Sequence, residues 1–200
     1  KQLLNRDKSL LRPLSLYGPF PGFPNVNSAR QSYYQSLVRA IVSQQLSTPA
    51  ANTIYFNLRS IVKALTPEQI NKLPIETLRA SGLSFSKAQS LKDLSLRALE
   101  NKINFSSLRK KLDHDVIEEL SEIRGIGPWT AQMFLLFKLG RLDVLPTTDL
   151  GVQEGIRILD KMDYRPSPAE VSKRGALWSP LRSVGAWLMW QIANANKGKS

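Results

Sequence analysis

The chain has 200 residues, of which 42% are hydrophobic, and its 28 lysines and arginines against 16 aspartates and glutamates give a formal charge of +12. This excess indicates a polyanionic partner, and no run of about 18 apolar residues is present that could span a membrane. The absence of cysteine excludes disulfides, thiolate metal sites and Cys-ligated iron–sulfur clusters. The single histidine, His114, excludes His-rich metal sites, and its position between Asp113 and Asp115 predicts a solvated surface residue.

Hydrophobic residues recur at helical spacing along most of the chain, and no segment has the pattern of a convincing strand. Residues 12–27 contain four prolines and two glycines and are expected to form a surface loop, whereas 194–200 are expected to form a basic, frayed tail. Ser47 and Thr66 are N-cap candidates with a proline close behind, which predicts a helix start at each. The helices predicted in this way are 32–43, 49–62, 67–73, 76–80, 86–101, 105–111, 116–123, 129–139, 150–159, 168–174 and 181–195. The sequence therefore predicts an all-α fold.

The most informative segment is the Gly-x-Gly turn formed by Gly125 and Gly127, between an acidic helical stretch at 113–123 and an apolar one at 129–139. Two glycines one residue apart permit positive φ angles and let the backbone approach a flat partner closely. Pro128 suits the first position of the helix that follows. Such a hairpin presents unpaired amides at a helix N-terminus, which predicts a binding site for one phosphate.

A second informative residue is Asp149, which follows Pro146 and occupies the N-cap position of the next predicted helix. For an isolated aspartate, capping alone would be the ordinary function. A carboxylate one short loop beyond a phosphate-binding hairpin can also face a sugar of the same strand. Both interpretations stay open at this point.

Residues 125–131, followed by Pro146 and Asp149, resemble the helix-hairpin-helix GPD superfamily of base-excision DNA glycosylases. Three further segments are similar to the compact 3-methyladenine DNA glycosylases of yeast and bacteria, namely residues 43–47, 82–88 and 178–183. The resemblance extends from about residue 33 to residue 193. It implies a single domain over 1–200 with two helical lobes and the DNA site in the cleft between them. The hairpin-bearing lobe would cover about 50–145, and the N- and C-terminal segments would form the other lobe.

The resemblance also implies that the protein flips a nucleotide out of duplex DNA while a side chain fills the gap. By this resemblance Gln45 is the plug, and Gln44, Leu46 and Ser47 are the neighbouring intercalation and minor-groove residues. The alternative is that Gln44 and Gln45 only satisfy backbone groups in a turn.

At the hairpin, the resemblance assigns the amides of Gly125, Gly127 and Thr130 to a DNA phosphate. It assigns the carbonyls of Ser121, Ile123 and Gly125 to a K⁺ or Na⁺ ion, and it implies no required cofactor. A bound cation would add positive field behind the amides.

The resemblance places the damaged base against Trp129, Met133 and Trp178. Relatives that also cut the DNA backbone have a Schiff-base lysine where this chain has Trp129, so no lyase activity is expected by that route. An indole can stack on a positively charged alkylated base. Asp149 is the expected catalytic residue, which would stabilise an oxocarbenium-like sugar and activate water.

Two functions remain open from the sequence. The first is a monofunctional glycosylase that releases bases of the 3-methyladenine type. The second is a homologue that binds abasic or distorted DNA without excising a base. Three departures from the family keep this second function open. Thr148 stands where many relatives have an acidic residue, Met133 stands where some bacterial members have an aromatic residue, and Ser47 is small. Under either function we expect a monomer that binds duplex DNA with alkylated or abasic sites and no membrane. The expected location is the nucleus of a eukaryote or the nucleoid-associated cytoplasm of a bacterium.

Overall fold

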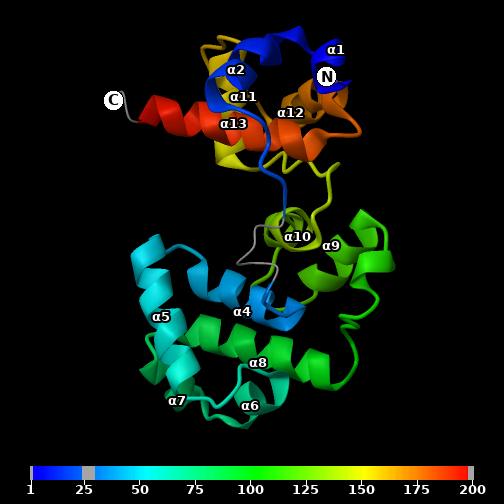
Figure 1. The fold of residues 1–200 in the computed structure, drawn as a ribbon. Coiled ribbons are helices and arrows are strands. Elements are labelled where there is room, and N and C mark those ends of the chain that lie inside the picture. Colours follow the sequence, from blue (N-terminus) through cyan, green and yellow to red (C-terminus); the bar gives the residue numbers. More distant parts are fainter. Residues whose placement is uncertain (1, 24–29, 198–200) are drawn as a thin grey trace. The chain divides into compact units, whose positions relative to one another are not determined.

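The computed structural model describes residues 2–23 and 30–197, and these residues form helices and turns without a strand. The predicted all-α fold is therefore confirmed. The chain divides into two compact units, one made of Lys1–Pro24 with Leu135–Ser200 and the other of Asn25–Phe134 (Figure 1). The DNA site expected in a cleft between lobes stays a prediction.

The unit Asn25–Phe134 is built around α8, which packs against α4, α6 and α7. Its helices are α4 (Tyr33–Ser43), α5 (Thr48–Ser60), α6 (Pro67–Lys72), α7 (Ile75–Ala80), α8 (Phe85–Leu99), α9 (Asp113–Ser121) and α10 (Pro128–Phe134). Helix α4 begins with a capping box between Ser32 and Gln35, and its apolar residues at helical spacing are buried, as the sequence predicted. The hairpin is the connection from α9 to α10.

The other unit consists of segments from both ends of the chain. Its elements are α1 (Gln2–Arg6), the 3₁₀ turn η1 (Lys8–Leu10), α2 (Leu11–Tyr17), the π-helix η3 (Leu135–Leu139), α11 (Leu150–Leu159), α12 (Pro168–Gly175), the 3₁₀ turn η4 (Ala176–Trp178) and α13 (Arg182–Lys197). Helices α11 and α13 form its most extensive helix pair. Their close approach depends on Gly155 having no side chain, since a Cβ there would lie 2.3 Å from the carbonyl oxygen of Met189.

Three segments differ from the predictions. Within the predicted loop 12–27, the structure has the helix α2 (Leu11–Tyr17), which tolerates Pro13 because a first-turn residue needs no intrahelical acceptor for its amide. Residues 24–29 lie outside the described part of the chain. The predicted helix 105–111 is reduced to the 3₁₀ turn η2 (Leu108–Lys110). In the predicted tail, α13 continues to Lys197, and residues 198–200 lie outside the described part.

The boundaries of the hairpin-bearing unit, Asn25–Phe134, also differ from the predicted 50–145. Helix α4 belongs to this unit because it packs on α5, α8 and α10. The residues after Phe134 belong to the other unit.

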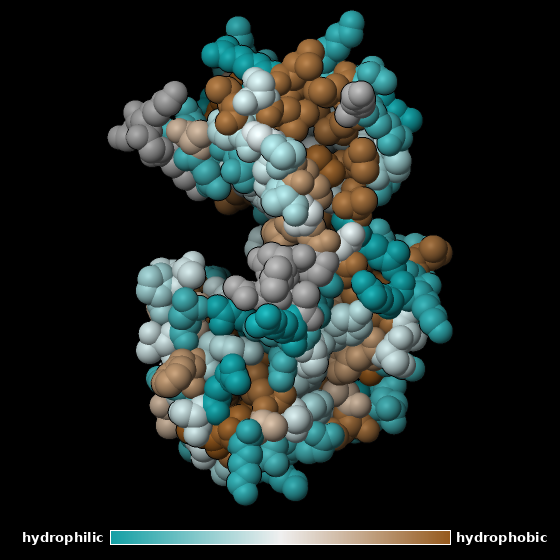
Figure 2. Space-filling view, viewed as in Figure 1, coloured by the Kyte–Doolittle hydropathy of each residue, from teal (hydrophilic) through white to brown (hydrophobic). Residues whose placement is uncertain are grey.

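The surface carries both hydrophilic and hydrophobic residues. Figure 2 shows hydrophilic residues spread over both units on the face that it presents. Among residues 2–23 and 30–197, no helix combines the length and apolarity needed to cross a bilayer.

A buried carboxylate joins the N-terminal segment to α12 and η4. Asp7 is 6% exposed and accepts hydrogen bonds from Arg174 Nη1 at 2.6 Å, Trp178 Nε1 at 2.8 Å and the backbone N–H of Ser9 at 3.1 Å. Burial by itself would raise the pKa of Asp7. The hydrogen bonds from these residues and the charge of Arg174 outweigh burial, so the pKa lies below its ordinary value.

We predict that Asp7→Asn lowers the free energy of unfolding by about 2 kcal/mol at pH 7, because it removes a buried charged acceptor, while Arg174 keeps its other partner, Asp160. Since the folded state depresses the pKa of Asp7, its contribution is present above the unfolded value of about 3.9 and is lost as pH falls through the folded pKa. Urea unfolding of both proteins at pH 7 and pH 3 measures this. A difference in stability that does not shrink at pH 3 would contradict it.

Candidate functional site

The two hairpin glycines have different functions in the fold. Gly125 has φ +78°, and a Cβ at this position would lie 2.6 Å from Ser90 Oγ of α8. Gly127 is outside the positive-φ region, and a Cβ there would meet nothing within 4 Å. Gly125 is therefore required by the turn itself, whereas Gly127 leaves open space beside the backbone.

The hairpin amides have the geometry expected of an anion site. In the part of the chain that the structure describes, the N–H groups of Gly125, Gly127 and Thr130 have no backbone acceptor, and the first backbone bond of α10 runs from the N–H of Ala131 to the carbonyl of Gly127 at 3.1 Å. Pro128 takes the first helical position, as predicted. Unpaired N–H groups at a helix N-terminus favour a bound anion.

Two of the three carbonyls expected to bind a cation already accept a hydrogen bond. Ile123 O accepts from the N–H of Ile126 at 3.0 Å, and Gly125 O accepts from Gln44 Nε2 at 2.7 Å. Each carbonyl keeps a second lone pair. Ser121 adds a buried hydroxyl that has no hydrogen-bond partner among the described residues. The K⁺ or Na⁺ ion expected here stays a prediction, and the described residues contain no cluster of three or more His, Asp or Glu suited to a metal ion.

The loop from α4 to α5 carries the residues expected to enter DNA. Gln45 has φ +55°, a left-handed conformation that is strained for a residue with a side chain. Gln45, Leu46 and Ser47 are exposed, and the side chain of Gln45 makes no hydrogen bond to the described residues. Ser47 occupies the N-cap of α5 without a side-chain capping bond. These three side chains are therefore not used to satisfy the turn.

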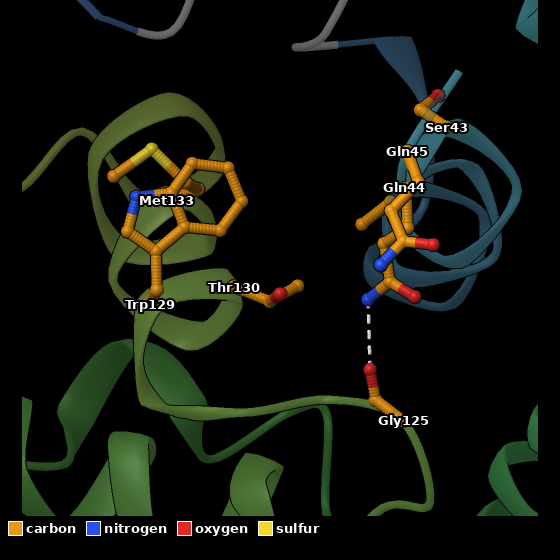
Figure 3. Close-up of a pocket in the computed structure, with 8 residues that line it drawn as sticks. Ser43, Gln44, Gln45, Gly125, Trp129, Thr130 and Met133 are labelled. Atoms are coloured by element: carbon orange, nitrogen blue, oxygen red, sulfur yellow. Dashed lines mark hydrogen bonds between the residues drawn. The ribbon is translucent and has the colours of Figure 1, made fainter. Parts of the chain in front are cut away.

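Gln44 behaves differently from Gln45. Its side-chain Nε2 donates to the carbonyl of Gly125 at 2.7 Å, which links the α4–α5 loop to the hairpin (Figure 3). The alternative interpretation from the sequence, that a glutamine satisfies a backbone group, therefore holds for Gln44. We assign Gln44 to the scaffold of the loop.

A cavity of about 500 Å³ separates the end of α4 from α10. Its lining consists of Ala40, Ser43, Gln44, Gln45, Gly125, Trp129, Thr130 and Met133. Figure 3 shows Trp129 and Met133 on one side of the cavity and the two glutamines on the other. Trp129 is 44% exposed, a large fraction for an aromatic residue. The structure thus brings Gln45 to the same cavity as Trp129 and Met133, which lie far from it in the sequence.

The prediction that Trp178 lines this cavity is wrong. Trp178 is fully buried in the core of the other unit, where its Nε1 donates to Asp7 at 2.8 Å. A Cβ at Gly185 would lie 2.3 Å from its ring, so the indole packs directly against the backbone of α13. The side chain is therefore part of the fold.

Asp149 caps α11, as its sequence position predicted, and it is 9% exposed. Its Oδ1 accepts the backbone N–H of Val152 at 2.9 Å and Nε1–H of Trp190 at 2.8 Å. The ring of Trp190 stacks on Phe137 with centroids 5.6 Å apart and an interplanar angle of 23°. Two N–H groups on one oxygen hold the carboxylate in a defined orientation.

The sequence did not identify Trp190 as a site residue, because its spacing in α13 is that of an ordinary core tryptophan. The available signal is chemical: a largely buried indole N–H needs an acceptor. Gly151 is a second such residue, since a Cβ there would lie 2.7 Å from Trp190 Cδ1. The glycine leaves the space that the indole occupies beside Asp149.

These features define a helix-hairpin-helix DNA-binding protein: an all-α basic chain, a hairpin with unpaired amides, and an exposed strained loop beside an aromatic cavity. The chain belongs to the HhH-GPD superfamily of base-excision DNA repair proteins, whose family profile matches residues 38–180.

Relatives in this family are similar over nearly the whole chain. The DNA-3-methyladenine glycosylase 1 of Schizosaccharomyces pombe is 34% identical over 191 residues, which cover 94% of this chain and 83% of that protein. A solved structure of the S. pombe 3-methyladenine DNA glycosylase Mag1 with abasic DNA has a TM-score of 0.84 at 34% identity, covering 95% of this chain and 93% of that one. A DNA-3-methyladenine glycosidase structure from Bacillus halodurans has a TM-score of 0.87 at 30% identity, covering 100% and 90%.

We predict that alanine substitution affects DNA binding at one hairpin glycine and stability at the other. Gly127→Ala should leave stability unchanged and weaken binding to damaged and undamaged duplexes alike, because a Cβ there enters open space that a phosphate would need. Gly125→Ala should lower the free energy of unfolding by about 2 kcal/mol, from positive φ and the contact with Ser90. Thermal unfolding and fluorescence anisotropy with labelled duplexes measure both effects. Unchanged DNA affinity in Gly127→Ala would refute the phosphate assignment.

Proposed function

We propose that the protein is a monofunctional DNA glycosylase that excises alkylated bases of the 3-methyladenine type from duplex DNA. The observation that carries this proposal is Asp149, a carboxylate held by two N–H groups on one oxygen in a chain of the base-excision family.

The cavity at Trp129 is suited to a flipped purine. Its volume of about 500 Å³ lies in the range of sites that bind small ligands, and no charged side chain lines it. An alkylated purine carries positive charge, which the face of the Trp129 ring attracts by a cation–π contact. Met133 adds a polarisable apolar surface.

Gln45 is the proposed plug. Its side chain is exposed and makes no hydrogen bond to the described residues, so its amide is available to the base left unpaired after flipping. An amide can donate to and accept from that base, whereas an aliphatic plug would only fill the space.

Asp149 supplies the chemistry. Alkylation of a ring nitrogen already makes the base a good leaving group, so the C1′–N bond breaks toward an oxocarbenium-like sugar, and the electron pair of that bond leaves with the base. The ionised carboxylate stabilises the positive sugar and accepts a proton from water as the water oxygen bonds to C1′. Neither a histidine nor a second carboxylate is needed.

Other parts of the proposal follow from single residues. Trp129 stands where bifunctional relatives have a Schiff-base lysine, so we expect no strand cleavage by that route. We expect no required cofactor, and a K⁺ or Na⁺ ion on the carbonyls of Ser121, Ile123 and Gly125 would strengthen the field at the phosphate site. The protein would act as a monomer on chromosomal DNA, in a nucleus or a bacterial nucleoid.

We predict that the protein releases 3-methyladenine from methylated duplex DNA and that Asp149→Asn lowers the single-turnover rate at least a hundredfold, because the neutral amide neither stabilises the sugar cation nor accepts the proton. Asparagine keeps the N-cap, so folding should be preserved. Chromatographic detection of the free base and thermal unfolding measure the two quantities.

Binding to a duplex with a tetrahydrofuran abasic analogue is measured in parallel with base release. Tight binding that weakens in Gln45→Ala, together with no base release by the wild type, would overturn the proposed activity and leave a protein that only recognises abasic DNA. Strand cleavage after base release would contradict the expected monofunctional reaction.

We further predict that Trp190→Phe lowers the single-turnover rate about tenfold to a hundredfold, because one hydrogen bond to the Asp149 carboxylate is lost. Abasic-DNA affinity should stay unchanged. Trp187→Phe is the matched control, since Trp187 lies on the same helix, is 8% exposed and packs on Phe20 with ring centroids 5.5 Å apart. Equal rate losses in both variants would show that the effect is only structural.

A further inference from the structure

The carbonyl groups at the end of α4 are held by a lysine from another helix. Lys87 Nζ donates to the carbonyl of Val42 at 2.8 Å and to that of Gln44 at 2.6 Å. The backbone N–H of Lys87 is itself fixed by the N-cap Ser84 of α8 at 3.2 Å. A cation at a helix C-terminus satisfies carbonyls that have no intrahelical donor. Lys87 therefore fixes the point where the chain leaves α4.

The residue that Lys87 holds is also tied from its side chain. Gln44 donates through Nε2 to the carbonyl of Gly125 at 2.7 Å, so Gln44 is fixed by its carbonyl on one side and by its amide on the other. Ser90, three residues after Lys87 on α8, lies so close to Gly125 that a Cβ on the glycine would be 2.6 Å from Ser90 Oγ. Helix α8 thus supports both turns, the α4–α5 loop through Lys87 and the hairpin through Ser90.

Gln45 follows this doubly fixed residue and has φ +55°. A left-handed residue just after a helix is a common helix ending, as at Asn101 and Lys161, and for a residue with a side chain it carries a steric cost that neighbouring contacts offset. The side chain of Gln45 has no hydrogen-bond partner in the described chain, so the constraint has to come from the adjacent backbone. The backbone N–H of Leu46 donates to the carbonyl of Ser43 at 3.3 Å and closes the turn, and the contacts of Lys87 and Gln44 hold Gln44, its second residue, in place.

We propose that Lys87 is a positioning residue, which holds Gln45 in its strained conformation so that the plug is in place before DNA binds. The inference rests on the proposed role of Gln45 as the plug. Pre-organisation of this kind raises affinity because the loop does not have to be ordered during binding. Burial also holds the pKa of Lys87 below its ordinary value, in keeping with a side chain directed into the protein.

The chain contains a matched control for Lys87. Lys92 lies on the same helix, and its Nζ donates to the carbonyl of Asn71 near the end of α6 at 2.6 Å. Both lysines therefore satisfy a carbonyl near a helix C-terminus. Only Lys87 does so beside Gln45, and each methionine substitution removes the same charge.

The experiment compares Lys87→Met, Lys87→Arg and Lys92→Met on a duplex with a tetrahydrofuran abasic analogue opposite 2-aminopurine, and on the undamaged duplex. We expect Lys87→Met to bind the abasic duplex about tenfold more weakly and to show a reduced 2-aminopurine fluorescence change. On the undamaged duplex it should match Lys92→Met. Lys87→Arg should restore both signals, since a guanidinium also donates to two carbonyls.

A double-mutant cycle with Gln45→Ala tests the coupling directly. If Lys87 acts through Gln45, adding Lys87→Met to Gln45→Ala should weaken abasic binding no further. Additive losses, or equal losses in Lys87→Met and Lys92→Met, would overturn the inference. If Lys87→Met does not fold by circular dichroism, Lys87→Gln, a shorter neutral donor, takes its place under the same criteria.

The outcomes also separate this inference from the proposed function. These measurements need DNA binding only. If the wild type releases no base, the proposed activity fails, but the double-mutant cycle can still be interpreted. If Gln45→Ala leaves abasic binding unchanged, the plug assignment fails and the inference fails with it. If Gln45→Ala weakens binding and Lys87→Met does not, the inference alone fails.

Discussion

The hydrogen bond from the Gln44 side chain to the Gly125 carbonyl connects the two turns on which the proposed DNA contacts of this unit depend. The hairpin would hold a phosphate and the α4–α5 loop would enter the base stack, and a contact between residues 81 positions apart sets their spacing. Because both turns rest on α8, the arrangement belongs to one compact unit. A duplex would meet surfaces already set in register, so little ordering entropy would oppose binding.

The other unit uses one chemical device for two purposes. Two of the four tryptophans donate their indole N–H to an aspartate, Trp178 to Asp7 and Trp190 to Asp149, each at 2.8 Å. Asp7 is also paired with the Arg174 guanidinium and joins segments of the fold. Asp149 accepts hydrogen bonds from a backbone N–H at a helix N-terminus and from an indole N–H, and these donors orient its carboxylate. The same pair of residue types therefore joins segments of the fold in one place and orients the proposed catalytic carboxylate in the other.

Local chemistry made much of this molecule predictable from its sequence. Pro128 at a helix start, Asp149 at an N-cap and the periodic apolar face of α4 each depend on residues within one or two turns. The errors have a different origin. Only the distant acceptor of each indole distinguishes Trp178, which donates to Asp7 in the core, from Trp190, which donates to the proposed catalytic Asp149. The scaffold function of Gln44 and the position of Lys87 likewise depend on contacts between segments far apart in sequence, which periodicity cannot reveal.

The two hairpin glycines have a consequence for how relatives of this chain should be compared. The Gly125 position is protected by folding, because any side chain there strains the turn and meets Ser90. The Gly127 position has no such protection, since nothing lies within 4 Å of where its Cβ would be. A descendant released from selection for DNA binding would keep the first glycine and lose the second, with no penalty in stability. A glycine at position 127 therefore indicates that a relative still binds DNA through its hairpin, whereas a glycine at position 125 indicates only that the turn still folds.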